Sequence, residues 1–199
     1  MWQYGNNGLN DSISSPPTTA GNGRTRYDSV AIALHWLTAA FVVAQFALSQ
    51  VWGFFDKPIR HDLIVTHMSF GVLLTAVIVA RIVWRLSPGH QVSPANNGWL
   101  EIASKAAHYY SLYVLLASEA VLGFLLGWSG KNGALSFFGL SIPSPLMPFS
   151  RESHHLIGEA HEWVGWSIII IATGHAVAAL FHHYVLRDGL LFRMAPSRG

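Results

Sequence analysis

Long apolar runs without charge constrain this 199-residue chain more than any other feature. Residues 29–55, 63–80 and 163–186 contain no Asp, Glu, Lys or Arg, and residues 106–130 contain only Glu119. Each run meets or nears the roughly 18 to 20 residues that an α-helix needs to cross a bilayer. We therefore predict an all-α integral membrane protein, a bundle of four transmembrane helices at about residues 28–52, 62–86, 100–128 and 154–186.

Composition points the same way. Charged residues make up 11% of the chain, against about 25% in a typical soluble domain. Such a chain cannot cover a normal water-facing surface. The absence of cysteine excludes disulfides, thiolate metal sites and a cysteine nucleophile. The net charge of +2 would suggest an anionic partner in a soluble protein. Here the basic residues serve as topology signals, and no nucleic acid partner is predicted.

The segments outside the apolar runs set the domain organisation. Residues 1–26 are rich in Gly, Asn, Ser and Thr, which predicts a disordered cytoplasmic tail before a helical domain at residues 27–196. The longest connection, residues 129–153, contains Gly and Pro residues that exclude a regular helix. Its interspersed apolar side chains favour a position at the membrane interface.

Basic residues are distributed unequally between the two sides of the predicted bundle, and this predicts its orientation. One side carries Lys57, Arg60, Lys131 and Arg151. The other carries twice as many: Arg24, Arg26, Arg81, Arg85, Lys105, Arg187, Arg193 and Arg198. Since cytoplasmic loops carry the excess of Lys and Arg, we expect both termini in the cytoplasm.

Histidines inside the predicted helices are candidate metal ligands. The chain has 11 histidines, and His161 and His175 lie fourteen residues apart on the last helix. That spacing gives about 21 Å of rise and a rotation about 40° short of whole turns, so the two share a face. By depth, His67 lies level with His161 near the outer side. His35 lies level with His175 on the cytoplasmic half.

Two histidine pairs at two depths are what two bis-histidine haems require, because an imidazole pair supplies both axial bonds to a low-spin iron. Small residues would leave room for the macrocycles, and Gly71, Gly165 and Gly174 are candidates. A lone histidine in a membrane helix could instead form a hydrogen bond between helices. Four histidines at matched depths favour haem ligation.

Other histidines compete for these positions. His108 lies near the depth of His35 and could replace a ligand, but we assign it a contact with a haem propionate or a quinone. At the cytoplasmic interface, His182 and His183 are expected to titrate in water. A zinc site remains conceivable among the histidines at the outer helix ends: His61, His154 and His155.

Two further features have open interpretations. An ionisable group at the depth of Glu119 marks a proton path or a buried pair, or else a protonated carboxyl bonded to a neighbouring helix. The outer residues Lys57, Arg60, Lys131 and Arg151 could draw a small anion toward the outer haem. They could equally form an ordinary solvated surface.

Several local motifs, taken in order, resemble those of the bacterial cytochrome b561 family of small di-haem membrane cytochromes. The resemblance covers about residues 26–196. The motifs are Ala33-Leu34-His35-Trp36, Thr66-His67-Met68-Ser69-Phe70-Gly71, Arg81 to Arg85, Lys105 to His108 with Tyr113, His161-Glu162, His175-Ala176, His182-His183-Tyr184, Arg187-Asp188 and Leu191 to Pro196.

The resemblance implies that His35, His67, His161 and His175 bind two haem b groups. It also implies a bacterial inner membrane protein that transfers electrons between an outer donor and the quinone pool. The members it is most similar to are superoxide oxidases, which would make superoxide the periplasmic donor and ubiquinone the acceptor.

Two other functions stay open at this point. One is a cytochrome b anchor subunit that relays electrons from a docked dehydrogenase or hydrogenase. The other is a haem-free metal transporter that uses the same histidines.

Overall fold

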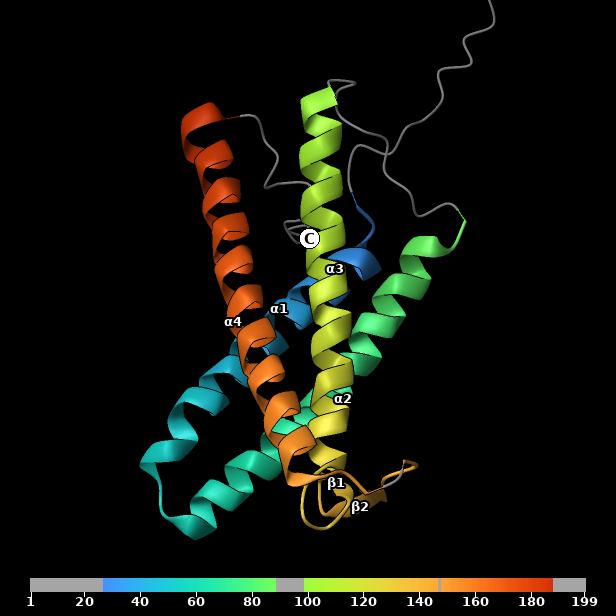
Figure 1. Ribbon diagram of the computed structural model, residues 1–199. Helices are drawn as coiled ribbons and strands as arrows, with labels where there is room; N and C mark the ends of the chain where they lie inside the picture. Colours follow the sequence, from blue (N-terminus) through green and yellow to red (C-terminus); the bar gives the residue numbers. More distant parts are fainter. Residues whose placement is uncertain (1–26, 89–98, 147, 188–199) are drawn as a thin grey trace, which may run out of the picture.

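We describe residues 27–88, 99–146 and 148–187 of a computed structural model, with only the backbone for residues 99–110 (Figure 1). The predicted tail at residues 1–26 lies outside the described residues. Of the described helices, 4 are long and apolar enough to cross a membrane. The predicted fold class, a membrane-spanning helical bundle, is confirmed.

The first two helices form one antiparallel pair. Helix α1 spans Ser29–Val51, followed by a 3-10 turn at Trp52–Phe54, and α2 spans Lys57–Leu86. Helix α2 begins earlier than the predicted residue 62, because Pro58 fits the first turn, where a missing N–H costs no helical hydrogen bond. The carboxyl of Asp28 caps α1 by accepting from the N–H of Ala31 at 2.9 Å.

The last two helices form the second pair. Helix α3 spans Trp99–Trp128 and α4 spans Arg151–Phe181, with a π-helical turn at His182–Leu186. Ser150 caps α4 by accepting from the N–H of Ser153 at 3.0 Å, so this helix also begins before its predicted start at residue 154.

The connection between α3 and α4 contains a β-hairpin that the sequence did not predict. Strand β1 (Ala134–Phe137) pairs antiparallel with β2 (Leu140–Pro143). The two linking residues, Phe138 and Gly139, have φ angles of 45° and 85°. Positive φ at both positions is the geometry of a tight hairpin turn, which an aromatic residue adopts only under strain.

This hairpin packs onto the helices. Leu135 is 3% exposed and lies against Gly127 of α3, where an added Cβ would approach Leu135 to 3.0 Å. The N–H of Phe138 donates to the hydroxyl of Ser69 on α2 at 2.9 Å, and Ser69 is fully buried. The hairpin is therefore anchored on α2 two residues past His67.

In Figure 1, α1 runs along α2 and α3 along α4, with the hairpin and the α1–α2 turn at the same end of the bundle. We call this end the hairpin end, and the opposite one, where α1 begins and α4 ends, the termini end. Ile78, Leu116 and Ile168 form a buried apolar cluster between α2, α3 and α4.

Many large apolar side chains face outward from the helices. Val43 is 64% exposed, Ile170 is 67% exposed and Val114 is 61% exposed. Exposed apolar side chains on helices long enough to span a membrane fit contact with lipid.

Candidate functional site

The first histidine pair lies toward the hairpin end. His67 on α2 and His161 on α4 have ring centroids 6.2 Å apart and ring planes at 86°. Trp52, at the end of α1, lies edge-on to His67 with a centroid distance of 5.1 Å. The two helices thus bring together histidines that are far apart in the sequence.

A second pair lies toward the termini end. His35 on α1 and His175 on α4 have ring centroids 6.5 Å apart and ring planes at 77°. Along α4, Ile168 lies seven residues from both His161 and His175, so all three share one face of the helix. Ile168 is 4% exposed, and the buried cluster therefore separates the two pairs.

Both separations fit a metal ion held between two imidazoles. At about 2 Å per metal–nitrogen bond, and with each ring centre about 1 Å beyond its nitrogen, two rings facing one ion have centroids about 6 Å apart. Among the described residues no group of three or more His, Asp or Glu side chains could hold a metal ion. An imidazole pair needs no third protein ligand when a porphyrin supplies the other four nitrogens.

Unpartnered polar atoms gather around the hairpin-side pair. Within the described residues, the buried side-chain nitrogen and oxygen atoms without a hydrogen-bond partner are Gln45 Oε1, His67 Nδ1, Glu119 Oε2, Trp128 Nε1 and His161 Nδ1. All belong to the half of the bundle nearer the hairpin. Buried polar groups are normally paired, so this region fits a polar group bound between the helices.

On the termini side, His35 has a basic neighbour. The Nδ1 of His35 lies 3.1 Å from the guanidinium of Arg81, which also stands 5.4 Å from the centre of the Tyr113 ring. Arginine has no acceptor, so Nδ1 must accept this hydrogen bond. The nearby indole of Trp84 donates to Asp28 at 3.0 Å and ties the start of α1 to the end of α2.

An acidic neighbour stands on the hairpin side. Glu119 Oε1 of α3 lies 3.3 Å from Nδ1 of His161. Of the three readings open for Glu119, a buried pair and a protonated carboxyl that contacts a neighbouring helix both have this partner in the structure, and the proton path stays a prediction. Neither this contact nor that of Arg81 could be read from the sequence, because both depend on how neighbouring helices are rotated.

The glycines predicted to make room for macrocycles have varied surroundings. A Cβ at Gly165 would meet the Glu119 carboxyl at 3.1 Å, and one at Gly71 would meet the Gln45 amide at 3.1 Å. At Gly174 nothing lies within 4 Å. Two of these glycines therefore accommodate a side chain of the neighbouring helix, and Gly174 borders open space.

The remaining histidines do not assemble into a zinc site in the described part of the chain. His154 pairs with the hydroxyl of Ser129 at 2.7 Å, and the exposed His155 lies 3.6 Å from Glu159. His183 stacks edge-on against Tyr184. The side chain of His108 falls outside the described residues, so its propionate or quinone contact stays a prediction.

Known proteins match nearly the whole chain. Residues 26–197 match the family model described as prokaryotic cytochrome b561. The chain is 31% identical over 179 residues to cytochrome b561 homolog 2 of Escherichia coli K12, covering 87% of this chain and 93% of the relative. Its identity to cytochrome b561 homolog 1 of the same organism is 32% over 182 residues, covering 87% and 98%.

A third relative carries a more specific name. The chain is 24% identical over 179 residues to the probable superoxide oxidase CybB of Yersinia pestis, covering 87% of this chain and 97% of the relative. The family match confirms the resemblance noted in the sequence, together with b-type haem binding and electron transfer in a membrane. This chain therefore belongs to the prokaryotic cytochrome b561 family.

Proposed function

We propose that the chain is a di-haem cytochrome that takes electrons from superoxide at its hairpin end and passes them to ubiquinone. The observation that carries this proposal is the presence of two histidine pairs at two depths, with centroid separations of 6.2 and 6.5 Å. One pair alone would serve a single haem. Two pairs along one face of α4 give a route through the membrane.

His67 and His161 would hold one haem, and His35 and His175 the other. When bound, a haem iron with two imidazole ligands exchanges single electrons and has no open position for oxygen chemistry. The chain's own residues orient the rings and exclude water between the pairs. Ile168 and its neighbours Ile78 and Leu116 supply this apolar separation.

Superoxide is the donor that we propose for the hairpin end. Each superoxide anion would lose one electron and leave as dioxygen. Four exposed basic side chains lie on this end, on segments that flank the hairpin-side pair: Lys57, Arg60, Lys131 and Arg151. Arg60 is held in place by donating to the carbonyls of Trp52 and Gly53 at 3.3 and 3.0 Å. Exposed carboxylates lie on the same segments, at Asp56, Asp62, Glu152 and Glu159, so this end has no net positive charge. Attraction of a small anion would therefore depend on the local field of the basic side chains nearest the hairpin-side pair.

Ubiquinone would take two electrons and two protons, the protons coming from water or a nearby histidine. The relative named as a probable superoxide oxidase supports superoxide as the donor, and ubiquinone as the acceptor rests on the resemblance noted in the sequence. We further propose that the chain lies in the bacterial inner membrane with both termini in the cytoplasm, because Lys and Arg are more numerous on the termini side. The hairpin end would then face the periplasm.

A spectrum of the purified chain tests the haem assignment. A reduced-minus-oxidised difference spectrum should show the sharp α band of b-type haem, with two haems per chain. One haem in fully loaded protein would overturn the two-site proposal. Absence of the band would favour the haem-free transporter.

Reaction of the same material with its substrates tests the donor and acceptor. Superoxide generated in the assay should reduce the haems, and a ubiquinone analogue should reoxidise them, without any partner protein. Haems that stay oxidised in superoxide would favour an anchor subunit that receives electrons from a docked dehydrogenase or hydrogenase.

A further inference from the structure

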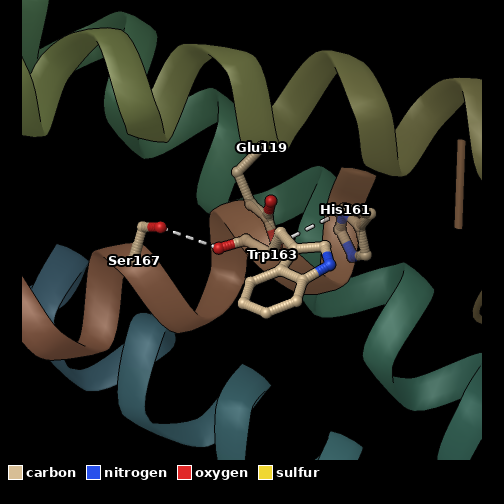
Figure 2. Close-up of polar contacts among 4 residues, drawn as sticks. All are labelled: Glu119, His161, Trp163 and Ser167. Atoms are coloured by element: carbon tan, nitrogen blue, oxygen red, sulfur yellow. Dashed lines mark hydrogen bonds and ion pairs between the residues drawn. The ribbon is translucent and has the colours of Figure 1, made fainter. Parts of the chain in front are cut away.

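One side chain of α3 reaches into the proposed hairpin-side haem site. Helix α3 carries none of the four paired histidines, yet its Glu119 places Oε1 3.3 Å from His161 Nδ1 of α4, as Figure 2 shows. The two side chains are 22% and 21% exposed. Glu119 lies within the part of α3 that is apolar enough to span the membrane. A carboxyl at that position is costly, and such residues are usually functional.

Glycines on both helices shape this contact. Gly165 lies four residues after His161, and a Cβ there would come within 3.1 Å of the Glu119 carboxyl. On α3, Gly123 lies four residues after Glu119, and a Cβ there would come within 3.4 Å of the His161 ring. Residues four apart share a helix face. On each helix, therefore, a glycine faces the polar side chain of the other helix.

The contact has no competing explanation in the surrounding hydrogen bonds. Neither His161 Nδ1 nor Glu119 Oε2 has a hydrogen-bond partner in the described part of the chain. The hydroxyl of Ser167, further along α4, donates to the carbonyl of Trp163 at 2.8 Å (Figure 2). Within the described residues, Glu119 is thus the polar side chain placed to meet the Nδ1 of His161.

We propose that Glu119 is a positioning residue for His161 and sets the redox potential of the hairpin-side haem. The inference rests on the proposed function, because it requires His161 to bind iron. A histidine that binds through Nε2 carries its proton on Nδ1. Glu119 Oε1 lies 3.3 Å from Nδ1 without a hydrogen bond between them in this structure, and a small adjustment would let the carboxyl accept that proton's hydrogen bond and fix the tautomer and the ring orientation. That hydrogen bond also makes the imidazole a stronger electron donor, which stabilises the oxidised iron.

The other histidines make this role specific to one haem. His35 Nδ1 faces the guanidinium of Arg81, and His67 Nδ1 has no hydrogen-bond partner among the described residues. The effect of Glu119 should therefore fall on the haem held by His161. The haem held by His35 and His175 then serves as an internal control within the same molecule.

Redox titration of the purified holoprotein tests the proposal with three variants. Glu119→Leu removes the acceptor, and Glu119→Gln keeps a carbonyl oxygen but loses the charge. Glu162→Leu removes a carboxyl next to His161 in the sequence, on an exposed position of α4. The readouts are the midpoint potential of each haem and the electron paramagnetic resonance signal of each oxidised iron.

Glu119→Leu should shift the equilibrium of the hairpin-side haem toward the reduced form by about tenfold, which is about 59 mV for one electron. Glu119→Gln should shift it less, Glu162→Leu less again, and the other haem should keep its potential. An unchanged potential in Glu119→Leu would overturn the proposal. If that variant loses the haem or fails to fold, the Gln variant decides: a raised potential supports the proposal and an unchanged one overturns it.

Failure of the proposed function gives a different result. If the di-haem assignment fails, the unaltered chain shows no two-haem spectrum, and neither potential exists to be measured. If only the donor or acceptor is wrong, both potentials remain measurable and the superoxide assay fails instead. A normal two-haem spectrum with no response to Glu119 overturns only the inference about this residue.

Discussion

The two histidine pairs have similar separations but opposite charged neighbours. On the hairpin side, His161 meets the carboxyl of Glu119 at 3.3 Å. On the termini side, His35 meets the guanidinium of Arg81 at 3.1 Å. An acidic neighbour favours oxidised iron, because that iron carries one more positive charge. A basic neighbour favours reduced iron, and its effect is large where water is partly excluded.

If each pair holds a haem, as we propose, this difference predicts the direction of electron transfer between them. We expect the hairpin-side haem to have the lower potential and the termini-side haem the higher one. Electrons would then pass downhill from the hairpin end to the termini end. The direction agrees with a donor outside the membrane and with reduction of quinone from the termini-side haem.

The pairs also differ in which ring nitrogen of the histidine can carry the proton, and therefore in how easily they bind iron. The Nδ1 of His161 faces an acceptor, so its proton can stay there and leave Nε2 free. The Nδ1 of His35 accepts from Arg81, which places the proton of a neutral ring on Nε2. For His35 to bind iron as a neutral imidazole, Arg81 must release Nδ1. We therefore expect the hairpin-side site to fill first when haem is added to the apoprotein.

Removing one ligand from each pair gives the largest expected effect. His67→Ala should abolish the hairpin-side haem and His35→Ala the termini-side haem, each lowering the haem-to-protein ratio from two to one. Difference spectra and haem quantification measure this. The control is His155→Ala, since His155 is exposed and its ring lies 3.6 Å from Glu159 of the same helix, away from both pairs. Loss of the same spectral component in both ligand variants would show that the pairs are wrongly assigned.

Changing Arg81 tests whether the charge beside His35 sets the potential of the termini-side haem. Arg81→Leu removes the positive charge beside His35 and should shift the termini-side haem toward its oxidised form by about tenfold, near 59 mV. Arg81→Lys keeps the charge and should shift it less. Redox titration of both haems measures the result. If Arg81→Leu moves the two potentials equally, the charge acts on the whole bundle and the two sites are not tuned separately.

The sequence could predict the positions of the two histidine pairs, which depend on features within each helix. It could not predict their charged neighbours. Uncharged runs predict membrane helices because the bilayer imposes their length, and depth along each run placed His67 beside His161 and His35 beside His175. The ligation itself stays a prediction. The contacts of Glu119 and Arg81 depend on the rotation of α3 and α2 about their axes. A run that is apolar all round carries little information on that rotation.

The hairpin escaped prediction for another reason. Its turn uses Phe138-Gly139, and Phe138 adopts a positive φ that sequence patterns assign to Asn, Asp or Gly. What holds Phe138 there is a tertiary contact, the hydrogen bond from its N–H to Ser69 on α2. Local sequence could not show that partner. The early start of α2 was missed similarly, because Pro58 between charged residues resembles a turn as much as a first helical turn.

The link between the hairpin and the nearby histidine pair can be broken at Ser69. Ser69→Ala leaves the N–H of Phe138 without its acceptor and should destabilise the hairpin-side half by about 1 kcal/mol. Heating the holoprotein while following each haem's absorbance measures this, and the hairpin-side haem should be released at a lower temperature. Thr75→Val is the matched control, since its hydroxyl donates only to the Gly71 carbonyl of the same helix at 2.8 Å. Equal release of both haems in Ser69→Ala would contradict a local role.

The smallest expected effect concerns the exposed basic side chains at the hairpin end. Changing Lys131 and Arg151 to Glu should slow haem reduction by superoxide a few-fold at low ionic strength. Charged clefts that focus the field can raise association rates by about 10- to 10³-fold. The effect expected here is smaller, because these two side chains are exposed. The difference should shrink as salt rises, since the Debye length is about 10 Å at 0.1 M. Stopped-flow reduction across ionic strengths measures it, with an unchanged haem spectrum as the control. A rate that responds neither to the substitutions nor to salt would mean that the donor is neutral or arrives on a partner protein. The comparison between the two ends would then rest on Glu119 and Arg81 alone, and the anchor-subunit function would gain support.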